Sequence, residues 1–177
     1  YYCGKITKIT IPDTVKTIGE GAFDYCTKLE TIILPNSITD IGNNAFRGCS
    51  NLQSITLHKS LTQIGDCAFY GCSSLLDVEY HKNLKSVASD ALTGTAWENS
   101  QPDGALAFGR ICYGYKGNIT NLVIPEGVSI IEPYAFLGCE QIKTVEFGPD
   151  VEEIGLYAFQ NCVNLEKMIC SSAVSII

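Results

Sequence analysis

The side chains best suited to chemistry in this 177-residue sequence are nine cysteines and two histidines. Thiolates and imidazoles bind zinc and act as nucleophiles or redox groups. The cysteines contain no Cys-x-x-Cys pair, and no cysteine–histidine spacing suits zinc. His58 and His81 are 23 residues apart and each precedes a lysine. Solvent-exposed side chains that recur at the same position of a repeat explain this spacing better than a pair of metal ligands does. We predict no metal, no cofactor and no catalytic residue.

Six cysteines share a spacing of their own. Four recur every 23 residues and two resume the same interval later, namely Cys3, Cys26, Cys49, Cys72, Cys139 and Cys162. Stacked on adjacent strands, their Cβ atoms would lie about 4.8 Å apart, longer than the roughly 3.8 Å of a disulfide. We therefore expect a reduced, buried ladder of small groups. The alternative is a redox or metal-binding stack.

Cys67 lies outside this ladder. Its position in the other copies of the repeat is held by residues typical of an exposed turn, Gly21, Asn44, Asp90, Tyr134 and Tyr157. Cys67 is therefore the candidate reactive thiol.

The elements that position these side chains come from an internal repeat of 23 residues. The block IGxxAFxGC recurs with Phe23, Phe46 and Phe69 in register, and Phe136 and Phe159 resume the interval. A segment of the form LxxIxLP precedes the next block, and its alternating apolar residues are typical of a half-buried strand. Because one copy cannot bury its own apolar side chains, the copies must stack as coils of a solenoid.

Each coil is expected to contain a strand, a return segment and a short helical turn at the Ala-Phe pair. Gly48, Gly71 and Gly138 precede the ladder cysteines, and Asn161 takes this position in the last copy. Glycine and asparagine favour the left-handed conformation, so we predict it there. Tyr25 breaks the pattern, and a different turn is expected in the first copy.

One coil is irregular. We predict a single domain over 1–177, with regular repeats at about 1–97 and 118–177 and an irregular coil at about 98–117. Residues 105–108 and 111–115 flank Gly109-Arg110, a spacing typical of a type II′ hairpin. Trp97, Tyr113 and Tyr115 are candidate exposed anchors of a binding protrusion. Alternatively, these aromatic rings fill the space of a missing regular coil.

The outward-facing side of the strands is the candidate protein-binding surface, because solenoids commonly bind along it. Its members are small, polar or weakly acidic: Thr10, Glu30, Ile33, Gln53, Thr56, Asp77, Glu79, Val123, Lys143 and Glu146.

Charge and hydropathy exclude two classes of function. The formal net charge is −7, and nucleic-acid binding needs clustered cations. The longest apolar runs have four or five residues, far short of the roughly 20 of a membrane helix. We expect neither nucleic acid as a partner nor membrane insertion. Phosphate-binding loops and nucleophile–base–acid arrangements are also absent from the sequence, so no enzyme is predicted.

The strand motif followed by IGxxAFxGC resembles the BspA-type leucine-rich repeats of bacterial and protozoan surface proteins over essentially the whole chain. The resemblance implies an α/β-type right-handed leucine-rich-repeat solenoid, dominated by strands. It also implies a non-catalytic cell-surface or secreted module for protein interaction or adhesion. The alternative is a passive spacer within a larger surface protein. Val174 and Ile177 occupy the slots of Ile38 and Ile41, so flanking repeats are expected.

Overall fold

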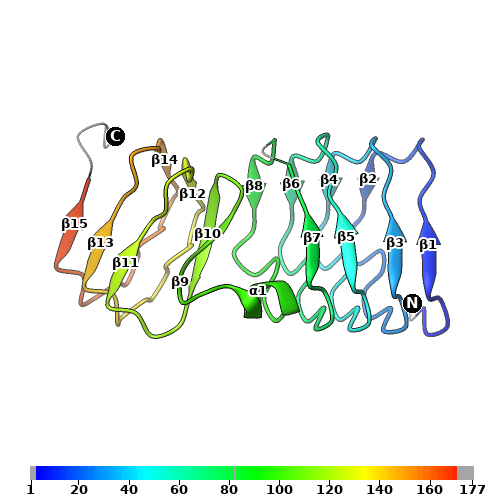
Figure 1. The fold of residues 1–177 in the computed structure, drawn as a ribbon, viewed down its shortest axis with the longest axis horizontal. Helices are drawn as coiled ribbons and strands as arrows, with labels where there is room; N and C mark the ends of the chain where they lie inside the picture. Colours follow the sequence, from blue (N-terminus) through cyan, green and yellow to red (C-terminus); the bar gives the residue numbers. More distant parts are fainter. Residues whose placement is uncertain (1–2, 82, 171–177) are drawn as a thin grey trace. The chain divides into compact units, whose positions relative to one another are not determined.

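The computed structural model describes residues 3–81 and 83–170, so Val174 and Ile177 lie outside the described residues. The chain divides into two compact units, Tyr1–Gln101 (unit 1) and Pro102–Ile177 (unit 2). Both are built from short strands joined by turns (Figure 1). The boundary falls close to the predicted start of the irregular coil. The single domain over 1–177 stays a prediction.

Unit 1 contains two parallel ladders of four strands each. One ladder is β1 (Lys8–Thr10), β3 (Thr31–Ile33), β5 (Ser54–Thr56) and β7 (Asp77–Glu79). The other is β2 (Thr17–Ile18), β4 (Asp40–Ile41), β6 (Gln63–Ile64) and β8 (Ser86–Val87). The register advances by one repeat per coil, as in Thr10 opposite Ile33 and Thr56 opposite Glu79. The predicted strand-dominated solenoid is confirmed.

Unit 2 combines three regular outer strands with a ladder that begins in a hairpin. The outer strands are β11 (Asn121–Val123), β13 (Thr144–Glu146) and β15 (Lys167–Ile169). The second ladder is ordered β14 (Glu153–Ile154), β12 (Ile130–Ile131), β10 (Ile111–Lys116) and β9 (Gly104–Phe108). Strands β9 and β10 are antiparallel, with Phe108 opposite Ile111, which confirms the predicted hairpin. Gly109 has φ 64°, as the first residue of a type II′ turn requires.

The repeated phenylalanines form the core of each unit. Ring centroids lie 5.2 Å apart for Phe23 and Phe46 and 5.3 Å apart for Phe46 and Phe69. Phe136 and Phe159 stack in the same way at 4.9 Å. Phe46 and Phe69 are fully buried. Stacked rings add about 0.5–1.5 kcal/mol to what burial alone contributes, so each coil stabilises the next.

The expected helical turn at Ala45-Phe46 is a series of tight turns instead. The N–H groups of Ala45 and Cys49 each donate to the carbonyl three residues earlier, while the N–H of Phe46 donates to Ala68 in the next coil. Because every second N–H bonds to a neighbouring coil, an α-helix cannot continue here.

The predicted left-handed residues are present, and a second set was missed. Gly48 (67°), Gly71 (71°), Gly138 (69°) and Asn161 (61°) have positive φ, as predicted. Tyr25 also has φ 52°, so the expected difference in the first copy is wrong. The second set is the column of Gly21, Asn44, Cys67, Tyr134 and Tyr157. The fixed path of the coil imposes the conformation, even on residues that rarely adopt it.

A helix that the sequence analysis did not predict, α1 (Ala96–Ser100), ends unit 1 (Figure 1). The hydroxyl of Thr95 accepts the N–H of Glu98 at 3.0 Å, and the Glu98 carboxylate accepts the N–H of Gly94 at 3.0 Å. This Thr-x-x-Glu pattern is a capping box, which stabilises a helix start. The N–H of Trp97 donates to the carbonyl of Leu75, which ties the helix to the preceding coil.

Candidate functional site

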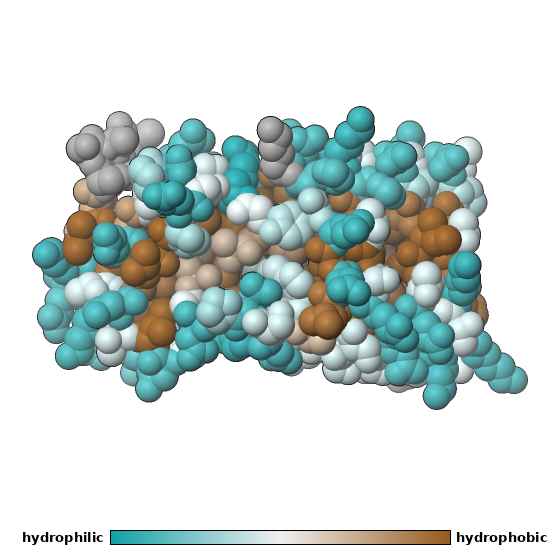
Figure 2. All heavy atoms as spheres, viewed as in Figure 1, coloured by the Kyte–Doolittle hydropathy of each residue, from teal (hydrophilic) through white to brown (hydrophobic). Residues whose placement is uncertain are grey.

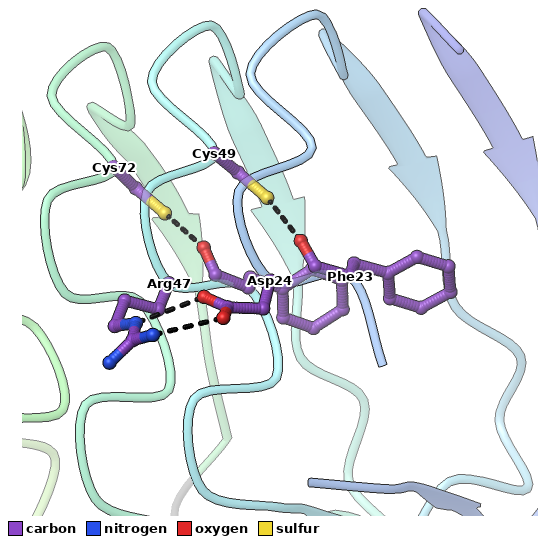
Figure 3. Close-up of polar contacts among 6 residues, drawn as sticks. Phe23, Asp24, Arg47, Cys49 and Cys72 are labelled. Carbon is purple, nitrogen blue, oxygen red and sulfur yellow. Dashed lines mark hydrogen bonds and ion pairs between the residues drawn. The ribbon is translucent and has the colours of Figure 1, made fainter. Parts of the chain in front are cut away.

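The ladder cysteines form no disulfides, and three of their thiols hydrogen-bond between coils. The Sγ–H of Cys49 donates to the carbonyl of Phe23 at 3.1 Å, and that of Cys72 donates to the carbonyl of Phe46 at 3.0 Å (Figure 3). Cys162 makes the same bond to Phe136 at 3.1 Å. The expected reduced ladder is present, buried at Cys26, Cys49, Cys72 and Cys139 and partly exposed at Cys3 and Cys162, and three of its thiols add a hydrogen bond between coils.

Burial makes several of these thiols unreactive. Desolvation raises the pKa of Cys26 to about 12 and that of Cys139 to about 11. The thiolate is the nucleophile and the metal ligand. Cys26 and Cys139, which stay in the thiol form, therefore suit a structural role, whereas the hydrogen bond with Cys72 lowers the pKa of the Cys49 thiol.

Cys67, the predicted reactive thiol, is only partly exposed. Its Sγ lies 3.8 Å from the carboxylate of Asp90. Burial, and then the negative charge of Asp90, raise the pKa of the Cys67 thiol. Both effects disfavour the thiolate, so the structure argues against the predicted reactivity.

The histidines differ from each other. The His58 Nε2 atom lies 2.9 Å from the carbonyl oxygen of Leu34 in the preceding coil and is partly buried, whereas His81 is exposed. Across residues 3–81 and 83–170, no three His, Cys, Asp or Glu side chains gather as a metal site would require. His58 thus contributes a structural contact between two adjacent coils.

All ten residues of the predicted strand face are exposed. In unit 1 they are Thr10, Glu30, Ile33, Gln53, Thr56, Asp77 and Glu79, and in unit 2 they are Val123, Lys143 and Glu146. Figure 2 shows apolar surface interrupted by polar side chains on the face that carries β1, β3, β5 and β7. The side chain of Thr56 donates to Glu79 at 3.1 Å across the ladder. This face is available to a partner of the chain.

In unit 1 the strand face is hollowed where α1 lies beside β5 and β7. A shallow pocket of about 500 Å³ is found there. It is lined by Ser54, Ile55, Thr56, Leu76, Asp77, Val78, Glu79 and Trp97. The pocket brings one of the predicted protrusion residues, Trp97, to three residues of the predicted strand face. The lining includes the carboxylate residues Asp77 and Glu79 and the aromatic residue Trp97.

The other two protrusion residues do not form exposed anchors. Tyr113 is fully buried, so the prediction for it is wrong. Tyr115 is partly buried, and its ring packs 6.3 Å from Phe136, while its hydroxyl accepts the side-chain N–H of Gln141 at 2.7 Å. Both rings fill core space at the hairpin, which is the alternative interpretation of the irregular coil.

Sequence reasoning missed Leu76 and Ser54 as part of the pocket. Leu76 occupies the slot of Glu30 and Gln53, and 51% of its surface is exposed. An apolar residue in an otherwise polar column was the available signal. The capping box from Thr95 to Glu98 was the signal that Trp97 lies on a helix rather than on a loop.

The polar column after the strands was also underestimated. The hydroxyls of Ser37 and Ser60 donate to carbonyls of the preceding coil at 2.6 and 2.8 Å. Asn83 donates to the carbonyl of Lys59 at 2.9 Å in the same way. A second polar ladder therefore accompanies the cysteine ladder.

Comparisons with solved structures return bacterial leucine-rich repeat proteins. A leucine-rich repeat protein of T. pallidum is 27% identical, with a TM-score of 0.57, over 93% of this chain and 67% of that one. A leucine-rich cell surface protein of Faecalibacterium prausnitzii is 28% identical, with a TM-score of 0.47, over 97% of this chain. This chain spans 43% of the length of that protein. The pneumococcal vaccine antigen PcpA is 22% identical, with a TM-score of 0.44, over 93% of this chain and 39% of that one.

No curated protein matches the chain. Within the described residues, no helix has the length and apolar character needed to cross a membrane. The BspA type Leucine rich repeat region matches residues 1–101 and 107–177 in six copies. These residues include both sets of stacked phenylalanines and the cysteine ladder. The chain therefore belongs to the BspA-type leucine-rich repeat family.

Proposed function

We propose that the chain is a non-catalytic protein-interaction module of a cell-surface or secreted protein, and that it binds its partner through the strand face. The observation that carries the proposal is the exposure of all ten strand-face residues, while the inward residues of β3, β5, β11 and β13 are buried. The rigid ladder holds these side chains at fixed spacing, so little conformational entropy is lost on binding. The likeness to a bacterial leucine-rich cell surface protein suggests the location.

Adhesion is the finer form of this proposal. The charge of the strand face is mixed and weakly acidic, which suits a protein surface and not a polyanion. Flanking repeats or domains would present the module away from the cell. A partner on a host cell or a neighbouring cell then fits best.

The test is binding of the full chain to an array of extracellular-matrix proteins and glycans, with two matched variants. Gln53→Arg changes the strand face and Gln63→Arg changes the other ladder of the same coil, and both residues are exposed. We expect saturable binding. Gln53→Arg should weaken this binding at least about tenfold, because a larger, charged side chain in the interface disturbs the contacts that carry most of the binding energy. Gln63→Arg should leave the binding unchanged. No binding above background at high micromolar concentration would favour the passive spacer.

A further inference from the structure

We propose that the pocket between β5, β7 and α1 in unit 1 binds an arginine side chain of an extended polypeptide. The inference rests on the proposed function, because it names the chemistry that the strand face recognises. The lining of the pocket combines the carboxylate residues Asp77 and Glu79 of the strand face with two apolar residues, Trp97 and Leu76.

The charge of the pocket selects a cation. Asp77 and Glu79 are two residues apart on β7, so both side chains point to the same face, and both are exposed. No lysine, arginine or histidine is among the residues that line the pocket. Thr56 donates to one Glu79 oxygen, which leaves the other carboxylate oxygens of the pair directed at the cavity or at solvent. A cation entering the pocket therefore gains attraction from two carboxylates and meets no like charge.

The aromatic wall favours guanidinium over ammonium. A guanidinium group is planar and can stack on an indole face while its N–H groups bind a carboxylate in a bidentate manner. An ammonium group has no plane to stack and keeps its water more strongly. The partly exposed Leu76 offers contact to the methylene carbons of the incoming side chain.

The pocket volume and its openness to the strand face favour a side chain on a polypeptide. About 500 Å³ exceeds what one arginine side chain fills, so the neighbouring residues of the partner also have room. Ser54 and Thr56 of β5 also line the pocket, and hydroxyl groups of this kind can bind backbone groups of an extended segment. The predicted ligand is thus an arginine with a residue on either side.

Trp97 is the sole tryptophan of the sequence, so its fluorescence reports this pocket directly. The experiment titrates the full chain with acetyl-Gly-Arg-Gly-amide. The same peptide carrying citrulline, which keeps the shape and removes the charge, is the matched ligand control, and a lysine peptide is the second. We expect a saturable change with a Kd on the order of 1 mM for so small a ligand. The citrulline peptide should bind at least about fivefold more weakly, and the lysine peptide about threefold more weakly.

Two variants locate the binding site. Asp77→Asn combined with Glu79→Gln removes both charges at constant size, and should weaken arginine binding about five- to tenfold. Asp13→Asn combined with Glu20→Gln is the matched control, because both carboxylates are exposed in unit 1 and lie outside the pocket and outside the strand face. It should leave the titration unchanged. Far-UV circular dichroism verifies the fold of each variant, and the peptide comparison on the unaltered chain is independent of any variant.

Equal binding of the arginine and citrulline peptides overturns the proposal, and so does a flat titration. Lysine binding as tight as arginine binding overturns the assignment of arginine. These outcomes differ from a failure of the proposed function. If the protein array shows binding that Gln53→Arg weakens while the arginine titration is flat, the strand face stands and the pocket assignment falls. If the titration succeeds and the array shows no binding, the pocket assignment stands and adhesion to matrix proteins and glycans falls.

Discussion

The two units build their second ladder differently. In unit 1 all four strands of this ladder are parallel, and each comes from one regular coil. In unit 2 the ladder begins with a hairpin, in which β10 pairs in parallel with β12 and antiparallel with β9. Tyr115 of the hairpin packs against Phe136, as a phenylalanine of a preceding coil would. A hairpin can therefore supply an aromatic ring to the coil that follows, although the Tyr115–Phe136 pair is tilted and 6.3 Å apart whereas the phenylalanine pairs are stacked at 4.9–5.3 Å.

The same phenylalanine slot is buried to a different extent in different coils, depending on the coils on either side of it. Phe46 lies between two stacked rings and is fully buried, whereas Phe23 and Phe159 each have one stacked phenylalanine and are partly exposed. The sequence letter is the same in all three slots. Stability in such a stack is the sum of coil and interface contributions.

The largest expected effect is the loss of a ring from the middle of the stack. Phe46→Ala should lower the free energy of unfolding of unit 1 by about 3–5 kcal/mol, as buried Phe→Ala changes do. Phe46→Leu should cost less than about 1.5 kcal/mol, because Leu92 fills this slot in a natural coil. Urea unfolding followed by Trp97 fluorescence measures both. Equal losses for the two variants would contradict the stacked core.

A second pair of variants tests the close approach of coils. A Cβ at Gly42 would lie 2.9 Å from the backbone N of Glu20 and 3.0 Å from the backbone C of Gly19, whereas a Cβ at Gly19 would meet nothing within 4 Å. Gly42→Ala should lower the free energy of unfolding by about 1–2 kcal/mol. The loss is limited because Ala88 occupies the same slot in a later coil, so the backbone there can accommodate a Cβ atom. Gly19→Ala should be neutral or slightly stabilising, since it restricts the unfolded chain. The reverse order in thermal unfolding would show that the coils are spaced differently.

The buried thiol of the hairpin predicts a dependence of stability on pH in unit 2. Burial raises the pKa of Cys112 from 9.0 to about 12. Between these values the unfolded chain loses the proton and the folded chain keeps it, so stability is complete below pH 9 and falls as the pH rises toward 12. Cys112→Ala should reduce the loss between pH 8 and pH 10 by about 1.4 kcal/mol. Urea unfolding followed by circular dichroism at the two pH values measures it, and identical losses with and without the thiol would refute the buried position.

A smaller effect is expected at the hydroxyl of Tyr115. Tyr115→Phe keeps the ring in the core and removes the hydrogen bond from Gln141, at a cost of about 1 kcal/mol. In a Gln141→Ala background the same change should cost close to nothing. Hydrogen exchange of the β10 amides reports the local stability. A full loss in both backgrounds would mean that the hydroxyl serves another contact.

Most of the fold was predictable because the repeat places equivalent side chains in register. The Phe and Cys columns, the strands and the exposed strand face follow from periods of 23 and 2 in the sequence, and the turn at Gly109 follows from a two-residue loop between two short strands. The second left-handed column was not predictable from residue type, since Tyr134 and Tyr157 disfavour the conformation that the coil path imposes.

The site was predictable in part. The exposure of Asp77 and Glu79 follows from strand alternation, whereas the pocket depends on where α1 docks. The position of α1 depends on the hydrogen bond from the N–H of Trp97 to the carbonyl of Leu75, a tertiary contact that the sequence pattern does not reveal. At Cys67 the repeat itself places Asp90 in the same column one coil later, but the exposure typical of that column drew attention away from the effect of this carboxylate on the thiol.

The most direct test of the stacked-coil account is a double-mutant cycle across the phenylalanine file of unit 1. Phe23 and Phe46 are adjacent rings, and Phe23 and Phe69 are separated by one coil. With Leu replacements followed by Trp97 fluorescence in urea, the account predicts a coupling energy of about 0.5–1.5 kcal/mol for the adjacent pair and about zero for the separated pair. Equal coupling in both pairs, or none in the adjacent pair, would contradict it.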